Sequence, residues 1–176
     1  MSALARVRAL PRRTLVIAGA VLLVVVAVIV VLVVRATAGP SSPGDVTFGA
    51  GGTTATTGAS QFCDVQVTEC GDDAGAQAVL RVPPNTPLVV TVPPEVASTP
   101  WQVAFTFRDT TGAIEQGRSP VLFGRTASPS FTLVLPTPTA QLQSAEVQQY
   151  GARVSEGPNG LAFATRATWV LSVDDR

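Results

Sequence analysis

The chain has 176 residues and a formal net charge of zero, with 46% hydrophobic residues and no histidine. All twelve basic residues are arginines, so the chain lacks the histidine or lysine of a Ser-His-Asp triad, a Ser-Lys dyad, a Schiff base or an imidazole metal site. After residue 35, seven arginines compare with twelve acidic residues, and this negative balance of about five charges argues against a nucleic-acid binder.

An uninterrupted apolar run over residues 15–34 dominates the N-terminal part of the chain. Its twenty residues include no charged or strongly polar side chain, and a helix of this length rises about 30 Å, the thickness of a bilayer's hydrocarbon core. Four arginines precede the run and one follows it, which by the positive-inside rule keeps the N-terminus in the cytoplasm. We therefore predict a cytoplasmic basic tail over residues 1–14, a single transmembrane helix over 15–34 and an extracytoplasmic C-terminal domain, anchored in the cell (inner) membrane.

A cleaved signal peptide is the alternative to an anchor. Ala36-Thr37-Ala38 matches the small-x-small pattern of a cleavage site after Ala38. The apolar core is longer than the roughly 7–15 residues of a signal peptide, and Arg35 lies between the core and the cleavage pattern. These features favour the anchor and leave cleavage open.

Residues 35–60 differ sharply in composition from the segments on either side. Nearly all of them are Gly, Ala, Ser, Thr or Pro, which is typical of a flexible linker. Residues 46–48 and the threonines within 53–57 leave open an edge strand or a hairpin. We place the extracytoplasmic domain at residues 61–176.

Cys63 and Cys70 are the only cysteines, seven positions apart on the predicted exported side. In an oxidising compartment such a pair forms a disulfide. A redox or thiolate metal site is the alternative, but the spacing is not CxxC and no other soft ligand is present. Four carboxylates surround the pair and suggest calcium, yet the glycine-punctuated ligand spacing of an EF-hand is absent, which favours a solvated acidic turn. These four residues are Asp64, Glu69, Asp72 and Asp73.

From residue 78 onward the chain alternates between short strand patterns and turns. Residues 101–108 are the clearest strand, with Trp101, Val103, Phe105 and Phe107 on one face. Residues 95–100 suggest a short crossing with a helical turn, and 141–150 an exposed strand. The pattern predicts an all-β fold, a small antiparallel immunoglobulin-like β-sandwich behind a single N-terminal transmembrane helix. The other predicted strands cover residues 78–82, 88–92, 114–117, 121–123, 131–135 and 165–173.

Several short motifs resemble those of a known family. They are Phe62-Cys63-Asp64, a second cysteine at 70, LRVPPNTP over residues 80–87, VPPEVA over 92–97 leading to Pro100-Trp101, and ATW over 167–169. Together they resemble an actinobacterial membrane-anchored envelope family catalogued as a domain of unknown function (family 2771), over roughly residues 45–173. The resemblance implies a place in an actinobacterial cell envelope. It supplies no catalytic residues to carry over.

Three functions fit these observations. The first is a non-enzymatic membrane-anchored accessory protein that binds another envelope protein, with no catalytic residue, cofactor or metal expected and no nucleic-acid partner. The second is an extracytoplasmic lipid- or glycan-binding module, which predicts a cavity lined by residues such as Phe105, Phe107 and Phe131. The third is a carboxylate-based hydrolase with Asp109 and Glu115 as an acid/base pair, although charges beside a turn are expected anyway. The first hypothesis is preferred.

Overall fold

The computed structural model of the chain describes residues 12–37, 42–123, 129–157 and 160–174. The chain divides into two compact units, Met1–Gly39 and Pro40–Arg176, which we call the N-terminal unit and the β-domain. The predicted basic tail lies mostly outside the described residues, and so does the alternative cleavage position after Ala38.

The N-terminal unit contains helix α1, Arg12–Thr37. Where its side chains are described, over residues 17–33, every residue is exposed. No helix in the described part of the chain is long and apolar enough to cross a membrane. The transmembrane helix predicted over residues 15–34 is therefore not confirmed.

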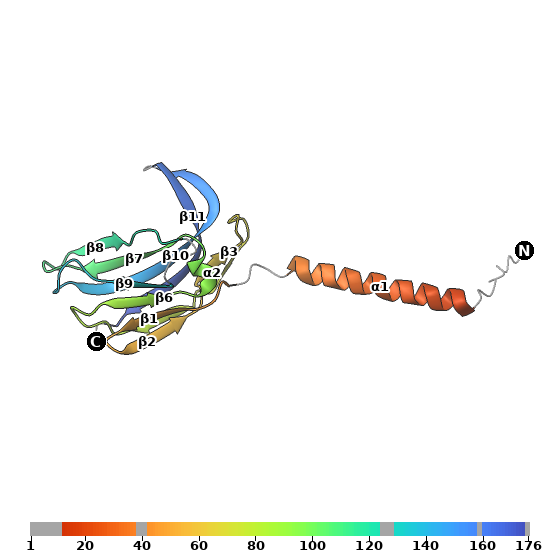
Figure 1. Ribbon diagram of the computed structural model, residues 1–176, viewed down its shortest axis with the longest axis horizontal. Coiled ribbons are helices and arrows are strands. Elements are labelled where there is room, and N and C mark those ends of the chain that lie inside the picture. The colour runs from red at the N-terminus through yellow and green to blue at the C-terminus, as the bar shows by residue number, and fades with distance from the viewer. Residues whose placement is uncertain (1–11, 38–41, 124–128, 158–159, 175–176) are drawn as a thin grey trace, which may run out of the picture. The chain divides into compact units, whose positions relative to one another are not determined.

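The β-domain consists of two sheets and one short helix, α2 (Pro94–Ala97) (Figure 1). The smaller sheet has the order β2 (Thr53–Thr57), β1 (Val46–Ala50), β6 (Leu88–Thr91) and β9 (Ser130–Leu133). The path of the larger sheet is β4 (Cys70–Asp72), β3 (Gln61–Cys63), β11 (Gly160–Val173), β10 (Gln141–Gly157), β7 (Trp101–Arg108) and β8 (Ile114–Arg118), with β5 (Gln77–Leu80) beside β11. The β5–β11 pair is parallel and the others are antiparallel. The predicted all-β, largely antiparallel fold is confirmed, and its immunoglobulin-like class stays a prediction.

Both sheets contribute side chains to one hydrophobic core. Phe48 and Val90 come from the smaller sheet, and Val103, Val147 and Trp169 from the larger; all five are fully buried. Alternate residues of each strand point to one face of a sheet, so the apolar positions with period two line the space between the sheets. This is the arrangement that the predicted strand pattern requires.

Strand β7 matches its predicted bounds, and its inward face is only partly as expected. Trp101 and Val103 are fully buried, whereas Phe105 and Phe107 are half-buried. The ring of Phe105 lies over Gly117, its cross-strand partner in β8, so closely that a Cβ on the glycine would overlap it. Because glycine has no side chain, the aromatic ring can pack directly on the backbone of β8. The same contact between an aromatic side chain and a strand glycine is found in other sheets.

The strand predicted at residues 141–150 is present as part of β10, but the prediction that it is exposed is wrong. Strand β10 is central, paired on one side with β7 and on the other with β11. Leu142, Ala145, Val147 and Gln149 are buried in it. This strand has polar residues on its outer face and a glutamine on its inner face. Its sequence therefore does not show the regular apolar alternation that marks a buried strand.

Folded structure begins at Val46, inside the linker that was predicted over residues 35–60. Strands β1 and β2 form a hairpin, and Val46, Phe48 and Ala50 are buried. Gly51 and Gly52 make its turn with φ of 57° and 84°, the left-handed region that glycine enters without steric cost. Of the alternatives left open for this segment, the structure has the hairpin. The β-domain therefore begins before residue 61, the boundary predicted from the sequence. Residues 38–41 of the linker lie outside the described part.

Strands β5, β6, β8, β9 and β11 match predicted strands and differ from them at their ends, whereas β3 and β4 were not predicted. The predicted helical turn is α2, and residues 121–123 contribute one isolated bridge, between Leu122 and Trp101. Gly157 at the end of β10 pairs with Gly160 at the start of β11; residues 158–159 and 175–176 lie outside the described part.

Candidate functional site

The strands β10 and β11 extend well beyond the rest of their sheet. Strand β10 pairs with β7 as far as Gln149, and β11 pairs with β3 at Ala167 and Thr168. Beyond those positions the two strands pair with each other and form a ribbon, residues 150–157 and 160–165, which we call the arm. Figure 1 shows this blue ribbon projecting from the sandwich.

Apolar side chains lie exposed on the arm. Val154 and Phe163 are directly paired across the two strands and are 47% and 57% exposed. The ring of Tyr150 lies 6.4 Å from that of Phe163, centroid to centroid. Exposed apolar groups gathered in this way often mark a binding surface.

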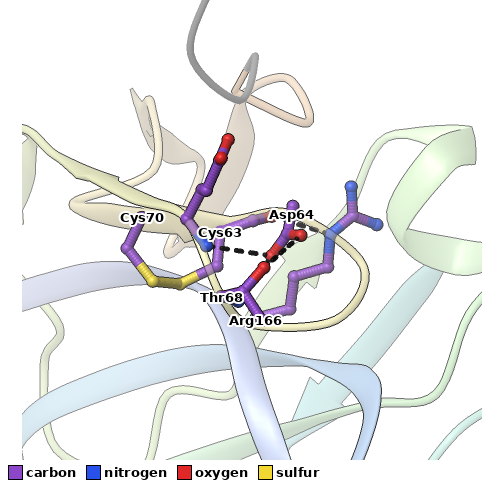
Figure 2. Close-up of a disulfide and its surroundings, with 6 residues drawn as sticks. Cys63, Asp64, Thr68, Cys70 and Arg166 are labelled. Carbon is purple, nitrogen blue, oxygen red and sulfur yellow. Dashed lines mark hydrogen bonds between the residues drawn. A yellow bond between two sulfur atoms is a disulfide. The ribbon is translucent and has the colours of Figure 1, made fainter.

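The predicted disulfide between Cys63 and Cys70 is present. The two residues are opposite each other in the β3–β4 pair. Between them, the carboxylate of Asp64 accepts hydrogen bonds from the backbone N–H of Thr68 at 2.6 Å, from the Thr68 hydroxyl at 2.8 Å and from the N–H of Glu69 at 3.2 Å (Figure 2). These bonds, first of all the one from the Thr68 backbone, hold the pKa of Asp64 below its usual value.

This disulfide loop, residues 63–70, docks on the base of the arm. The N–H of Ala152 donates to the carbonyl of Val65 at 3.0 Å, and Nε of Arg166 donates to the carbonyl of Cys63 at 3.0 Å (Figure 2). Ala152 lies where the register between β10 and β11 shifts, so the irregularity frees a backbone donor for the loop. The arm is therefore held at its base from both strands.

Val67 has a backbone conformation that is unusual for its residue type. Its φ is 55°, and a β-branched residue at positive φ is a true outlier that costs on the order of 1–3 kcal/mol. Its side chain sits against Gly151, where a Cβ would come within 2.7 Å of Val67 Cγ2 and 3.0 Å of the Val65 carbonyl oxygen. The close fit of loop and arm offsets this cost. The glycine inside strand β10 was the one sequence signal for this contact.

A polar pocket lies beside the arm base, where the chain enters the β-domain. Its volume is about 390 Å³, and we call it the entry pocket. It is lined by Ser42, Pro43, Gly44, Glu95, Gln149 and Arg166. Arg166 therefore belongs both to this pocket and to the dock of the disulfide loop.

Gln149 is fully buried in the entry pocket, and half of its amide is unsatisfied. Its Nε2 donates to the hydroxyl of Thr99 at 2.8 Å and to the carbonyl of Glu95 at 3.4 Å. The Thr99 hydroxyl donates its own hydrogen to the carbonyl of Val96, so it can only accept from Gln149, which fixes the orientation of the amide. Oε1 is then left buried with no hydrogen-bond partner, at a cost of about 1–3 kcal/mol.

A second pocket lies at the other end of β10. It measures about 240 Å³ and lies between the turns at residues 83–87 and 134–138, and we call it the turn pocket. Buried Val82, Leu88, Leu133 and Leu142 are among its lining residues. Its walls are mainly proline and apolar side chains, so it suits an apolar ligand.

The carboxylates predicted as a hydrolytic pair or a calcium site lie in ordinary turns and strands. Asp109 accepts hydrogen bonds from Thr111 and Ala113 in the β7–β8 turn, and bonding by the Thr111 side chain lowers its pKa most. Glu115 is exposed on β8, and neither residue lines the two pockets above. Within the described residues, no group of three or more His, Cys, Asp or Glu could hold a metal ion.

The three phenylalanines predicted to line one cavity lie in different sheets. Phe131 belongs to the smaller sheet, whereas Phe105 and Phe107 belong to the larger, with their ring centroids 6.0 Å apart. Phe105 and Phe131 pack against the core. Phe105 alone borders a shallow polar hollow of about 220 Å³, so neither this hollow nor the two pockets above is the predicted cavity.

Comparison with known proteins identifies one family. A family model described as a protein of unknown function (DUF2771) matches residues 39–174. No curated protein and no solved structure matches the chain. The matched range spans almost the whole β-domain, so the role of the domain has to be argued from its own geometry.

Proposed function

The chain belongs to the DUF2771 family of proteins of unknown function, and on the geometry of its β-domain we propose that it is a non-enzymatic, membrane-anchored accessory protein. In this proposal the β-domain binds another protein of the actinobacterial cell envelope through the arm. The N-terminus is cytoplasmic and the β-domain is extracytoplasmic.

The arm is the observation that carries this proposal. A two-stranded ribbon is marginally stable by itself in water, and this one leaves Val154 and Phe163 about half exposed. A partner that covers the two side chains would remove their apolar surface from water and stabilise the ribbon. Docking of the disulfide loop at Ala152 and Arg166 orders the base of the arm before binding, which reduces the entropy that association loses.

The membrane part of the proposal rests on residues 15–34. Twenty successive residues without a charge, preceded by four arginines, are the pattern of a single-pass anchor with a cytoplasmic N-terminus. Apolar side chains of α1, such as Leu22 and Leu23, are more than 60% exposed. They would be favourably placed in lipid.

Site-specific photo-crosslinking in cells tests the protein contact. A benzophenone amino acid replaces Phe163 in the full-length protein, and the matched control places it at Ile114 of β8, which is 56% exposed at the other end of the larger sheet. We expect one dominant envelope protein crosslinked from position 163 and not from 114, and a yield about tenfold lower after Val154→Asp. Equal yields from 163 and 114, or no effect of Val154→Asp, would contradict the proposal.

The turn pocket favours a second candidate, a lipid-binding module. Val134 is 69% exposed and lines this pocket, whereas Val89, 42% exposed on β6, does not. Binding of a fluorescent fatty acid to the full-length protein in mild detergent should weaken about tenfold in Val134→Arg and stay unchanged in Val89→Arg. Equal binding by both variants would rule out the turn pocket as the site.

A further inference from the structure

We propose that the entry pocket binds a small zwitterion, a molecule with a primary ammonium group close to an anionic group. Free amino acids and the phosphoethanolamine headgroup of lipids share this chemistry. The inference concerns a different surface from the arm and holds or fails independently of the proposed partner.

The first support is the missing donor at Gln149. Its Oε1 is buried and without a hydrogen-bond partner, while Nε2 is held by the Thr99 hydroxyl and the Glu95 carbonyl. Buried polar atoms in native proteins are almost always hydrogen-bonded, so this oxygen calls for a donor that the described residues do not supply. Gln149 is among the residues that line the entry pocket, and an ammonium group, which has three donors and no acceptor, is suited to supply the missing hydrogen bond.

The second support is the pair of opposite charges that line the pocket. Glu95 comes from α2 and Arg166 from β11. Figure 2 shows the two terminal nitrogens of Arg166 pointing away from the disulfide, beyond the Nε that binds the Cys63 carbonyl. A zwitterion can satisfy both charges, with its ammonium toward Gln149 and Glu95 and its anionic group toward Arg166.

The charge balance favours a zwitterion over a simple anion. Asp64 is close enough to Arg166 for the two charges to interact, so Arg166 is not an unopposed cation. Asp64, Glu95 and Arg166 together have one net negative charge. A ligand without an ammonium group would leave the carboxylate of Glu95 uncompensated.

The wall formed by the entering chain gives the pocket a defined shape. The carbonyl of Gly44 accepts a hydrogen bond from Trp169 Nε1 at 2.9 Å, and Trp169 is fully buried in the core. Gly44 has a φ of 94°, and a Cβ there would come 3.3 Å from Pro93 Cγ. Glycine therefore lets residues 42–44 lie close to the segment before α2 and close one side of the pocket.

The test measures binding of glycine and of glycerophosphoethanolamine, a phosphodiester like the lipid headgroup, in separate titrations, to the full-length protein in mild detergent by saturation-transfer NMR. We expect saturable binding of at least one, and the stronger one distinguishes an amino acid from a lipid headgroup. Acetate and methylamine, each with one of the two charges, should bind at least about tenfold more weakly. No saturable binding of either zwitterion up to about 10 mM would overturn the inference.

Two variants and one control assign the binding to the pocket. Gln149→Leu removes the acceptor and Glu95→Gln removes the carboxylate charge. Gln148→Leu alters the preceding residue of β10, which does not line the pocket. We expect affinity to fall about tenfold in the first two and to stay unchanged in the control. Since Glu95 is exposed, Glu95→Gln decides the question if Gln149→Leu does not fold. Unchanged binding in Glu95→Gln, or an equal loss in Gln148→Leu, would overturn the proposal.

Discussion

Asp64 shows how much local structure one side chain can organise. Its carboxylate accepts three hydrogen bonds from Thr68 and Glu69 inside the disulfide loop, so the loop is ordered by more than its covalent link. Asp109 likewise organises the β7–β8 turn, where its carboxylate accepts from Thr111 and Ala113. Aspartates of this kind cap turns, and in both cases the bonded form is the ionised one.

We predict that Thr68→Val raises the pKa of Asp64 toward its usual value, because the hydroxyl donor is lost while the backbone donors remain. A depressed folded-state pKa means that the folded protein binds this proton less readily than the unfolded chain. The resulting stabilisation is present above the usual carboxyl pKa and is lost as the pH falls through the lowered value. NMR titration of the Asp64 carboxyl carbon measures the shift.

Thr111→Val is the matched control, since it removes the same kind of donor from Asp109. It should raise the pKa of Asp109 and leave that of Asp64 unchanged. If the pKa of Asp64 is the same in Thr68→Val and the wild type, the hydrogen bond from the Thr68 hydroxyl does not lower that pKa.

At the scale of elements, the disulfide loop and the arm depend on each other. The loop provides a carbonyl for Ala152 and another for Arg166, and the arm provides Gly151, on which Val67 rests. The contact joins segments 84 to 103 positions apart, between residues 63–67 and 151–166. Through this contact the disulfide loop and the base of the arm order each other.

The double variant Cys63→Ala/Cys70→Ala should therefore affect both elements. Closing so short a loop contributes about 2.5 kcal/mol in the chain-entropy model, and urea unfolding should show a loss of about this size. Hydrogen exchange at the Ala152 amide should also accelerate, because its acceptor is in the loop. The amide of Val147, in the middle of β10, is the internal control, and an unchanged Ala152 rate would show that the arm base does not need the disulfide.

At the scale of the whole molecule, one core joins the two sheets. The hairpin β1–β2 lies in a compositionally linker-like segment, yet it contributes Phe48, which is fully buried against residues of both sheets. Residues 46–57 are thus part of the folding unit. The β-domain therefore extends beyond residues 61–176, the range predicted from the sequence.

We predict that Phe48→Ala destabilises the β-domain by about 3–5 kcal/mol, the usual cost of removing a buried aromatic ring. Thr54→Ala, an exposed position of the same hairpin, should change stability by less than about 0.5 kcal/mol. Urea unfolding of the full-length protein in mild detergent, followed by tryptophan fluorescence, measures both. Similar stabilities for the two variants would mean that the hairpin is not integral to the core.

Local patterns in the sequence determined the all-β, largely antiparallel character of the fold, strand β7, the positions of turns and the disulfide. Each depends on neighbouring residues: period two for a strand, proline and glycine for a turn, and an isolated pair of cysteines for a bridge. The apolar run at residues 15–34 is equally local, and its role as an anchor stays a prediction.

Only the tertiary structure decided which strands are central, where the β-domain begins and which residues meet at the arm base. Strand β10 is buried because β7 and β11 flank it, and its glutamines do not reveal this. Gln149, Glu95 and Arg166 line one pocket although they are far apart in sequence. Such sites arise from contacts between distant segments, and the energy of those contacts depends on strand order and register, which a one-dimensional pattern does not contain.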